Sequence, residues 1–157
     1  MGILTRFTDI MKSNINALLD KCEDPAIMID QTLRDLRADL AEVKKETANI
    51  IADAKSADRQ VQECEDEIAK YTTAAQNALK AGNEDDARTL IAKKQQYESN
   101  LVSYKKTQEL THANADKMRQ MHDKLVNDIE TLEARRDAIK ATVASAKAQE
   151  HINKIVS

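Results

Sequence analysis

The sequence contains few of the residues that form turns or wide hydrophobic cores. Its 157 residues include two glycines, one proline and no tryptophan, and three tyrosines and one phenylalanine are its aromatic residues. So few turn-forming residues exclude a sheet-rich fold with many tight turns. The glycine count also excludes the glycine-rich loops that cradle phosphates in P-loop and dinucleotide-binding proteins. With so few aromatic side chains, a wide aromatic core is excluded as well.

Charge and hydropathy exclude further classes of protein. The chain has 24 basic and 27 acidic residues, a net charge of −3, so no nucleic-acid partner is expected. No apolar run approaches the roughly 18–20 residues that span a bilayer. Arg6, Asp9 and Lys12 interrupt the N-terminus, where a signal peptide has an uncharged stretch. Two cysteines, Cys22 and Cys64, are too few for a disulfide framework, and we expect a cytoplasmic protein.

Charged residues make up 32% of the chain, and the abundant Ala, Lys, Glu, Gln and Leu are typical of long helices. Asp24 and Pro25 form a helix cap followed by proline in the first helical position. Gly82 suits the left-handed end of a helix, and Asn83 suits the cap of the next one. The sequence therefore predicts three helices, at about 3–21, 25–80 and 84–153.

The second and third expected helices each carry a heptad seam, with apolar residues at alternating steps of four and three. The fifteen seam positions of the second helix are Ile29, Leu33, Leu36, Leu40, Val43, Thr47, Ile50, Ala54, Ala57, Val61, Cys64, Ile68, Tyr71, Ala75 and Ala78, and fourteen of them are apolar. The eighteen of the third helix are Ala87, Leu90, Lys94, Tyr97, Leu101, Tyr104, Gln108, Thr111, Ala115, Met118, His122, Leu125, Ile129, Leu132, Arg136, Ile139, Val143 and Ala146, and thirteen of them are apolar. This period predicts a left-handed coiled coil. Folding about Gly82 pairs residues whose numbers sum to about 165, which matches seam with seam. We predict an all-α fold: an N-terminal amphipathic helix followed by a long antiparallel two-helix coiled-coil hairpin.

Two domains are expected: a membrane-binding helix at 1–24 and the hairpin at 25–157, with its helices at 25–80 and 84–153 and its tip at 81–84. Some seam positions in the third helix are polar, and His122 is expected to be buried opposite Val43, where it specifies register. Cys64 is expected to be a small buried hydrophobic residue.

The expected first helix has one broad apolar face and one polar face. Together with the terminal amine, its basic residues make this end locally positive. An interfacial helix that lies in the headgroups of an anionic membrane has this pattern, and we expect it to be largely unfolded without lipid. The alternative is that the apolar face packs on the hairpin or on a neighbouring subunit. The residues expected to contact lipid are Ile3, Leu4, Arg6, Phe7, Ile10, Met11 and Lys12.

Candidate catalytic and metal-binding residues are scattered. His112, His122 and His151 do not lie on adjacent helical turns, so they do not predict a metal site. The carboxylate clusters at 63–67 and 84–86 have no expected pocket, and no Ser-His-Asp or Cys-His arrangement is present. We expect no enzyme activity, no cofactor and no metal.

Several short motifs form a specific combination along the chain. They are Met1-Gly2-Ile3-Leu4-Thr5-Arg6-Phe7, residues 14–21, Glu23-Asp24-Pro25 followed by Met28-Ile29-Asp30-Gln31, Glu84-Asp85-x-Ala87-Arg88-x-Leu90-Ile91, and Glu133-Ala134-Arg135. In these motifs the chain resembles the phage shock protein A family, within the ESCRT-III-like superfamily of bacterial membrane-remodelling proteins. The family usually has Ala at Cys22, Arg or Lys at Asn83 and Leu at Asp86, so the chain departs from the pattern there.

This resemblance implies an envelope-stress protein, peripheral on the inner face of the cytoplasmic membrane. The first helix would insert into anionic lipid, and the hairpins would stack into a homo-oligomer of rods or rings. Family members normally continue into further assembly helices, so a truncated or short form is expected. Some members inhibit an AAA+ transcriptional activator, and a soluble scaffold or regulator of that kind and a purely structural polymer are the alternatives. The residues assigned to the hairpin tip are Gly82, Asn83, Glu84, Asp85 and Arg88.

Overall fold

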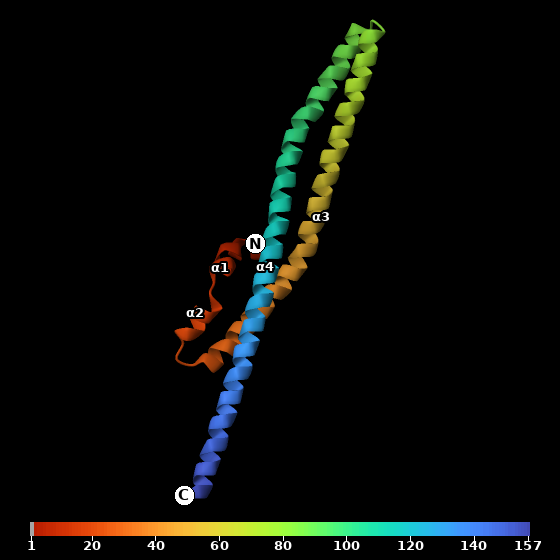
Figure 1. Ribbon diagram of the computed structural model, residues 1–157. Helices are drawn as coiled ribbons and strands as arrows, with labels where there is room; N and C mark the ends of the chain where they lie inside the picture. Colours follow the sequence, from red (N-terminus) through yellow and green to blue (C-terminus); the bar gives the residue numbers. More distant parts are fainter. Residues whose placement is uncertain (1) are drawn as a thin grey trace. The chain divides into compact units, whose positions relative to one another are not determined.

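A computed structural model describes residues 2–157, and all regular structure within them is helical (Figure 1). Met1, whose terminal amine is part of the expected positive charge, lies outside the described residues. The expected all-α class with two long helices that pack on each other is confirmed. The elements are the 3-10 helix η1 (Ile3–Arg6) and the α-helices α1 (Phe7–Lys12), α2 (Ile15–Asp20), α3 (Pro25–Lys80) and α4 (Glu84–Val156).

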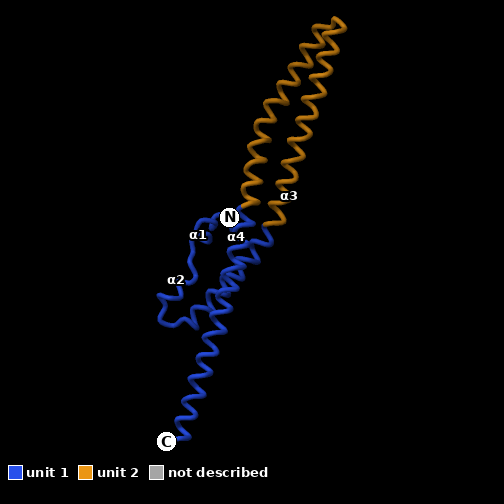
Figure 2. The backbone as a smooth tube through the Cα atoms, in the orientation of Figure 1, with its two compact units in different colours: residues 1–46, 117–157 blue, residues 47–116 orange. Residues whose placement is uncertain are grey.

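The chain forms two compact units (Figure 2). Unit 1 comprises residues 1–46 and 117–157, and unit 2 comprises residues 47–116. Helices α3 and α4 contribute to both units. The N-terminal helices therefore share a compact unit with the first turns of α3 and the last part of α4.

In unit 2, α3 ends at a glycine-dependent turn. Gly82 has a φ of 80°, which lies in the left-handed region. Its N–H donates to the carbonyl of Leu79, and the N–H of Asn83 donates to the carbonyl of Ala78. These two bonds form a Schellman motif, which satisfies carbonyls that the end of a helix leaves free. The local chemistry of Gly82 thus fixes where the hairpin reverses direction.

Replacing Gly82 with alanine is expected to destabilise the hairpin by about 1 kcal/mol, because a residue with a β-carbon resists the left-handed conformation. The new β-carbon would meet nothing within 4 Å, so no clash contributes. Thermal unfolding followed by circular dichroism measures the effect. Gly2→Ala is the matched control, since Gly2 has an ordinary φ of −92° and should tolerate alanine. Equal melting temperatures for the two variants would contradict this account of the turn.

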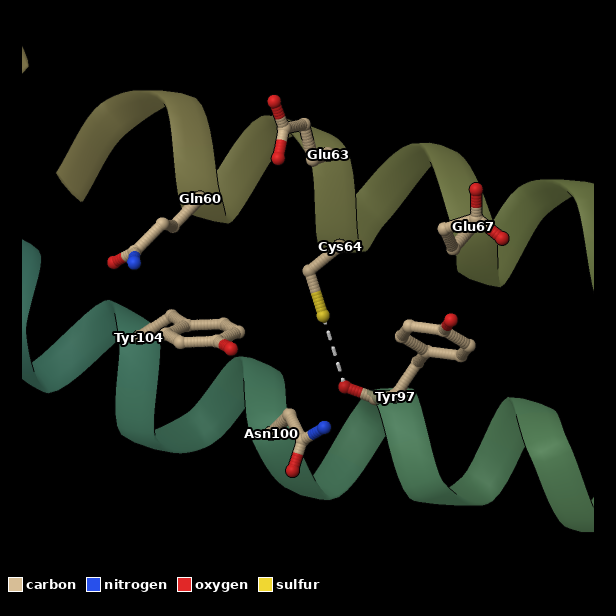
Figure 3. Close-up of a pocket in the computed structure, with 7 residues that line it drawn as sticks. All are labelled: Gln60, Glu63, Cys64, Glu67, Tyr97, Asn100 and Tyr104. Atoms are coloured by element: carbon tan, nitrogen blue, oxygen red, sulfur yellow. Dashed lines mark hydrogen bonds between the residues drawn. The ribbon is translucent and has the colours of Figure 1, made fainter. Parts of the chain in front are cut away.

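Small side chains fill the seam of unit 2, where Ala54, Ala57, Val61, Cys64, Ala75 and Ala87 are buried. Figure 3 shows Cys64 of α3 pointing toward Tyr97 of α4, and its thiol donates to the Tyr97 carbonyl at 3.0 Å. Burial raises the pKa of this thiol, which keeps it protonated and unreactive. The prediction that Cys64 is a buried hydrophobic residue is confirmed.

Polar and charged side chains of α3 pair with those of α4 in unit 2. Asp58 of α3 accepts hydrogen bonds from the Gln108 amide at 2.8 Å and the His112 ring at 2.7 Å. These bonds, with the Gln108 bond as the largest cause, lower the pKa of Asp58. Lys105 lies 3.8 Å from Glu65 on the same pair of helices. The residue numbers of these three pairs sum to 166, 170 and 170, close to the sum of about 165 that the turn predicts, so the contacts agree with the expected register.

In unit 1, the core includes a third layer in addition to the two long helices. Helix α2 packs onto α3 and α4. Val43, Met118, Met121 and Leu125 are also fully buried in this unit. The N-terminal helices therefore help to form the hydrophobic core. The buried cluster consists of Ile15, Leu19, Ile29, Leu33, Ile129 and Leu132.

The prediction that His122 is buried opposite Val43 is wrong. Its side chain is 42% exposed, and its ring lies 3.2 Å from the Asp123 carboxylate. Met121, one residue earlier, is fully buried instead. Lys117 and Lys124, one turn to either side of Met121, contact N-terminal residues. The N-terminal segment therefore covers the helix face that carries Met121 and leaves His122 at the edge of the seam.

The last part of α4 carries the heptad pattern but has no partner helix among the described residues of unit 1. Val143 and Ala146 lie on the predicted seam, yet both are exposed. In the expected register, residue 143 would face residue 22, which precedes the start of α3 at Pro25. Helix α4 thus extends beyond the first residue of its partner within unit 1.

Candidate functional site

The candidate site is the N-terminal segment, defined here as residues 3–20. The sequence predicts one continuous helix over this segment, but the structure has three short helices. The chain breaks at Ser13, whose ψ is 140° and whose hydroxyl donates to the Ile10 carbonyl at 2.8 Å. The Asn14 side chain then accepts from the Ala17 N–H at 3.1 Å and caps α2. The prediction fails because Ser and Asn side chains compete with backbone helix bonds.

The apolar face of this segment lies against the hairpin part of unit 1. Ile3 and Ile10 are only 1% and 6% exposed. Leu4, Phe7 and Met11 are partly buried, while Arg6 and Lys12 are exposed. The expectation that the segment is unfolded without lipid therefore does not hold, and the structure shows its apolar face packed on the hairpin. The structure brings all seven predicted lipid-contacting residues together on two consecutive short helices, η1 and α1.

An ion pair connects the start of the segment with α3. Arg6 lies 2.6 Å from the carboxylate of Asp39. Asp39 is buried, whereas the Arg6 side chain is about half exposed. A buried carboxylate needs a partner for its charge, and Arg6 provides one.

Cations on α4 also contact the segment. The Lys117 ammonium lies 5.4 Å from the centre of the Phe7 ring, within the range of a cation–π contact. Lys124 donates to the Ser13 hydroxyl at 3.3 Å and also contacts the buried carboxylate of Asp128.

Arg135 continues this set of contacts along α4 toward α2. Its guanidinium lies 3.5 Å from the Asn16 side chain and 3.6 Å from the Asp20 carboxylate. Together with the contacts described above, α4 presents a second stripe at heptad spacing, beside the seam. The stripe consists of Lys117, Met121, Lys124, Asp128 and Arg135.

Sequence reasoning missed this second stripe and Asp39. A two-helix seam explains one apolar stripe per helix, and the mixed residues beside it are typical of a solvated flank. One signal of the second stripe is present in the sequence. Met121 and Asp128 are one heptad apart, and each directly precedes a seam position. Spacing alone could not identify the segment that covers them.

The predicted tip residues lie together at the turn of unit 2, and all of them are exposed. Arg88 lies 4.0 Å from Glu84 and 3.8 Å from Asp85. Contacts this long between exposed groups contribute little to stability. The role of Gly82 and Asn83 beyond the turn itself stays a prediction.

The described residues contain neither a membrane-spanning helix nor a metal-binding cluster. Within residues 2–157, no helix is both long enough and apolar enough to cross a bilayer. The same residues contain no group of three or more side chains placed to hold a metal ion. The groove drawn in Figure 3, between Gln60 and Tyr104, is lined by none of the predicted lipid-contacting or tip residues.

Comparison with known proteins finds one matching family model and several similar proteins. A model of the PspA/IM30 family matches residues 2–157. The chain is 49% identical over 155 residues to a phage shock protein A homolog of Bacillus subtilis, covering 99% of this chain and 68% of the relative. It is 28% identical over 156 residues to the membrane-associated protein Vipp1 of Nostoc punctiforme, covering 99% of this chain and 60% of the relative. A phage shock protein A homolog of Deinococcus radiodurans is 27% identical over 155 residues, with 99% and 70% covered.

Proposed function

The chain belongs to the PspA/IM30 family, and from this premise we propose that it is a peripheral membrane protein of the envelope-stress response that binds anionic lipid through its N-terminal segment. The observation that carries the proposal is the amphipathic pattern of residues 3–12, where bulky apolar side chains lie beside Arg6 and Lys12. A relative, Vipp1 of Nostoc punctiforme, is named as membrane-associated, which supports the same assignment.

Binding by one subunit is expected to be weak. A large apolar side chain contributes about 1.5–3 kcal/mol when fully buried, and shallow insertion contributes less. Each basic residue near anionic lipid adds about 1 kcal/mol. The negative surface of the cytoplasmic leaflet would attract Arg6 and Lys12, so we place the protein on the inner face of the cytoplasmic membrane.

Self-assembly would compensate for weak binding, because linked copies bind a surface with high effective concentration. The exposed heptad pattern at the end of α4 supports a homo-oligomer, since Val143 and Ala146 have no partner helix in unit 1. Stacked hairpins in rods or rings are the assembly we propose.

An AAA+ transcriptional regulator as a partner stays a prediction.

Vesicle flotation of the whole chain tests the proposed function. We expect co-flotation with small phosphatidylglycerol vesicles, weaker binding to large ones, and little binding to phosphatidylcholine. Raising the salt concentration should weaken binding to the anionic vesicles, because salt screens Arg6 and Lys12 from the lipid charge. Absence of co-flotation at every vesicle size and lipid composition would overturn the proposal.

A further inference from the structure

We infer that the hairpin face of unit 1 competes with the membrane for the N-terminal segment, so that the segment must be released before it binds lipid. This inference rests on the proposed function, since it concerns the regulation of the same residues. The hairpin face is formed by Asp39 of α3 and by the second stripe of α4.

Contact with the hairpin and contact with lipid exclude each other. Ile3 and Ile10 are almost fully buried, so neither side chain can enter a bilayer while the segment is docked. A ligand that binds only the released form has its apparent affinity reduced by the fraction of molecules in that form. The stability of the docked form therefore sets how readily the protein binds a membrane.

The ion pair between Arg6 and Asp39 links this competition to lipid charge. Arg6 is both the partner of a buried carboxylate, at 2.6 Å, and one of the two basic groups expected to attract anionic headgroups. A lipid phosphate offers the guanidinium the same bidentate geometry as a carboxylate. Anionic lipid can therefore replace Asp39 as the partner of Arg6, whereas a neutral surface has no net charge to draw Arg6 away.

Contacts with α4 stabilise the docked form further. The Lys117 ammonium lies over the Phe7 ring, 5.4 Å from its centre. Lys124 bonds to Ser13 at the break between α1 and α2. Residues 3–13 are thus held at Arg6, Phe7 and Ser13, and Arg135 adds contacts to the segment at Asn16 and Asp20. Release of residues 3–13 requires the first three contacts to open.

The test compares Asp39→Asn with Asp35→Asn. Asp39→Asn removes the ion pair with little change in shape, and Asp35→Asn makes the same change in net charge at an exposed position one turn earlier on α3. We expect Asp39→Asn to bind phosphatidylglycerol vesicles about two- to fivefold more tightly than the wild type, because the Arg6 side chain of the pair is half exposed and ion pairs with solvent-exposed partners are weak. Asp35→Asn should bind like the wild type.

A measurement without lipid tests the docked form directly. In a chain with Cys22→Ala and Cys64→Ala, a single Ile10→Cys should react slowly with a maleimide, and Asp39→Asn or Arg6→Gln should each accelerate that reaction several-fold. Leu18→Cys, at an exposed position on α2, gives the fast reference rate. Circular dichroism confirms that each variant keeps its helices.

The outcomes separate the two proposals. Equal labelling at positions 10 and 18, or equal behaviour of Asp39→Asn and Asp35→Asn, would overturn the competition. If labelling responds to Asp39→Asn but no variant binds vesicles, the docked form stands and the proposed membrane function fails. If the wild type binds vesicles and Asp39→Asn changes neither rate nor affinity, the function stands and the inference fails.

Discussion

Replacing Phe7 with glutamate is expected to abolish co-flotation with anionic vesicles. Phe7 is the only phenylalanine of the chain, and its ring supplies the largest apolar surface among the lipid-contacting residues. Full burial of such a ring contributes about 1.5–3 kcal/mol, so losing its shallower insertion lowers the affinity by up to roughly ten- to a hundredfold. The new carboxylate also repels anionic lipid, so the combined effect should exceed the binding free energy of one subunit.

The same substitution should leave the hairpin folded. Phe7 is only partly buried, and Lys117 lies over its ring, so a glutamate at this position can pair with the lysine. Circular dichroism should therefore show the helix content of the wild type. This stability separates a defect in lipid binding from a defect in folding.

Thr8→Glu is the matched control for Phe7→Glu. Thr8 is exposed on the polar side of the segment, so its replacement adds the same charge without removing an inserting side chain. We expect this variant to keep most of its flotation at moderate salt, where the added charge is partly screened. Equal flotation of the two variants, or an unfolded Phe7→Glu chain, would show that Phe7 is part of the protein core and not of a membrane-binding face.

The hairpin could be predicted from the sequence because local chemistry fixes its ends. Pro25 begins α3 and Lys80 ends it, since proline suits the first helical turn and Gly82 adopts the left-handed conformation that follows the last one. Between these ends, the spacing of apolar residues alone is enough to identify the heptad seam. Every predicted seam position of α3 is buried or partly buried in the structure.

The docked N-terminal segment could be predicted only as one of two alternatives, because its position depends on a third layer that the pattern of two helices does not encode. The heptad pattern places His122 in the core and Met121 on the flank. In the structure, which includes the N-terminal segment, Met121 is fully buried and the His122 side chain is 42% exposed. The ion pair between Arg6 and Asp39 joins residues 33 positions apart, and neither residue is unusual in its local sequence. An amphipathic face also has the same pattern whether it meets lipid or protein.

Leu132 and Val143 test how far the cooperative core of α4 extends. Both lie on the predicted seam, but Leu132 is 0% exposed and Val143 is 47% exposed. Leu132→Ala is expected to lower the free energy of unfolding by about 2–5 kcal/mol, because it leaves a cavity in a packed core. Val143→Ala should change it by less than about 0.5 kcal/mol, as is usual for surface positions.

Urea unfolding of the whole chain, followed by circular dichroism at low protein concentration, measures both effects. Leu132 belongs to the same buried cluster as Ile15 and Leu19 of α2, so its truncation should also loosen the N-terminal segment. Leu132→Ala is therefore expected to increase the maleimide reaction of Ile10→Cys, while Val143→Ala leaves it unchanged. A large loss of stability with Val143→Ala would mean that this part of α4 is covered in solution. A loss with Leu132→Ala that leaves the reaction of residue 10 unchanged would mean that the segment does not depend on this core.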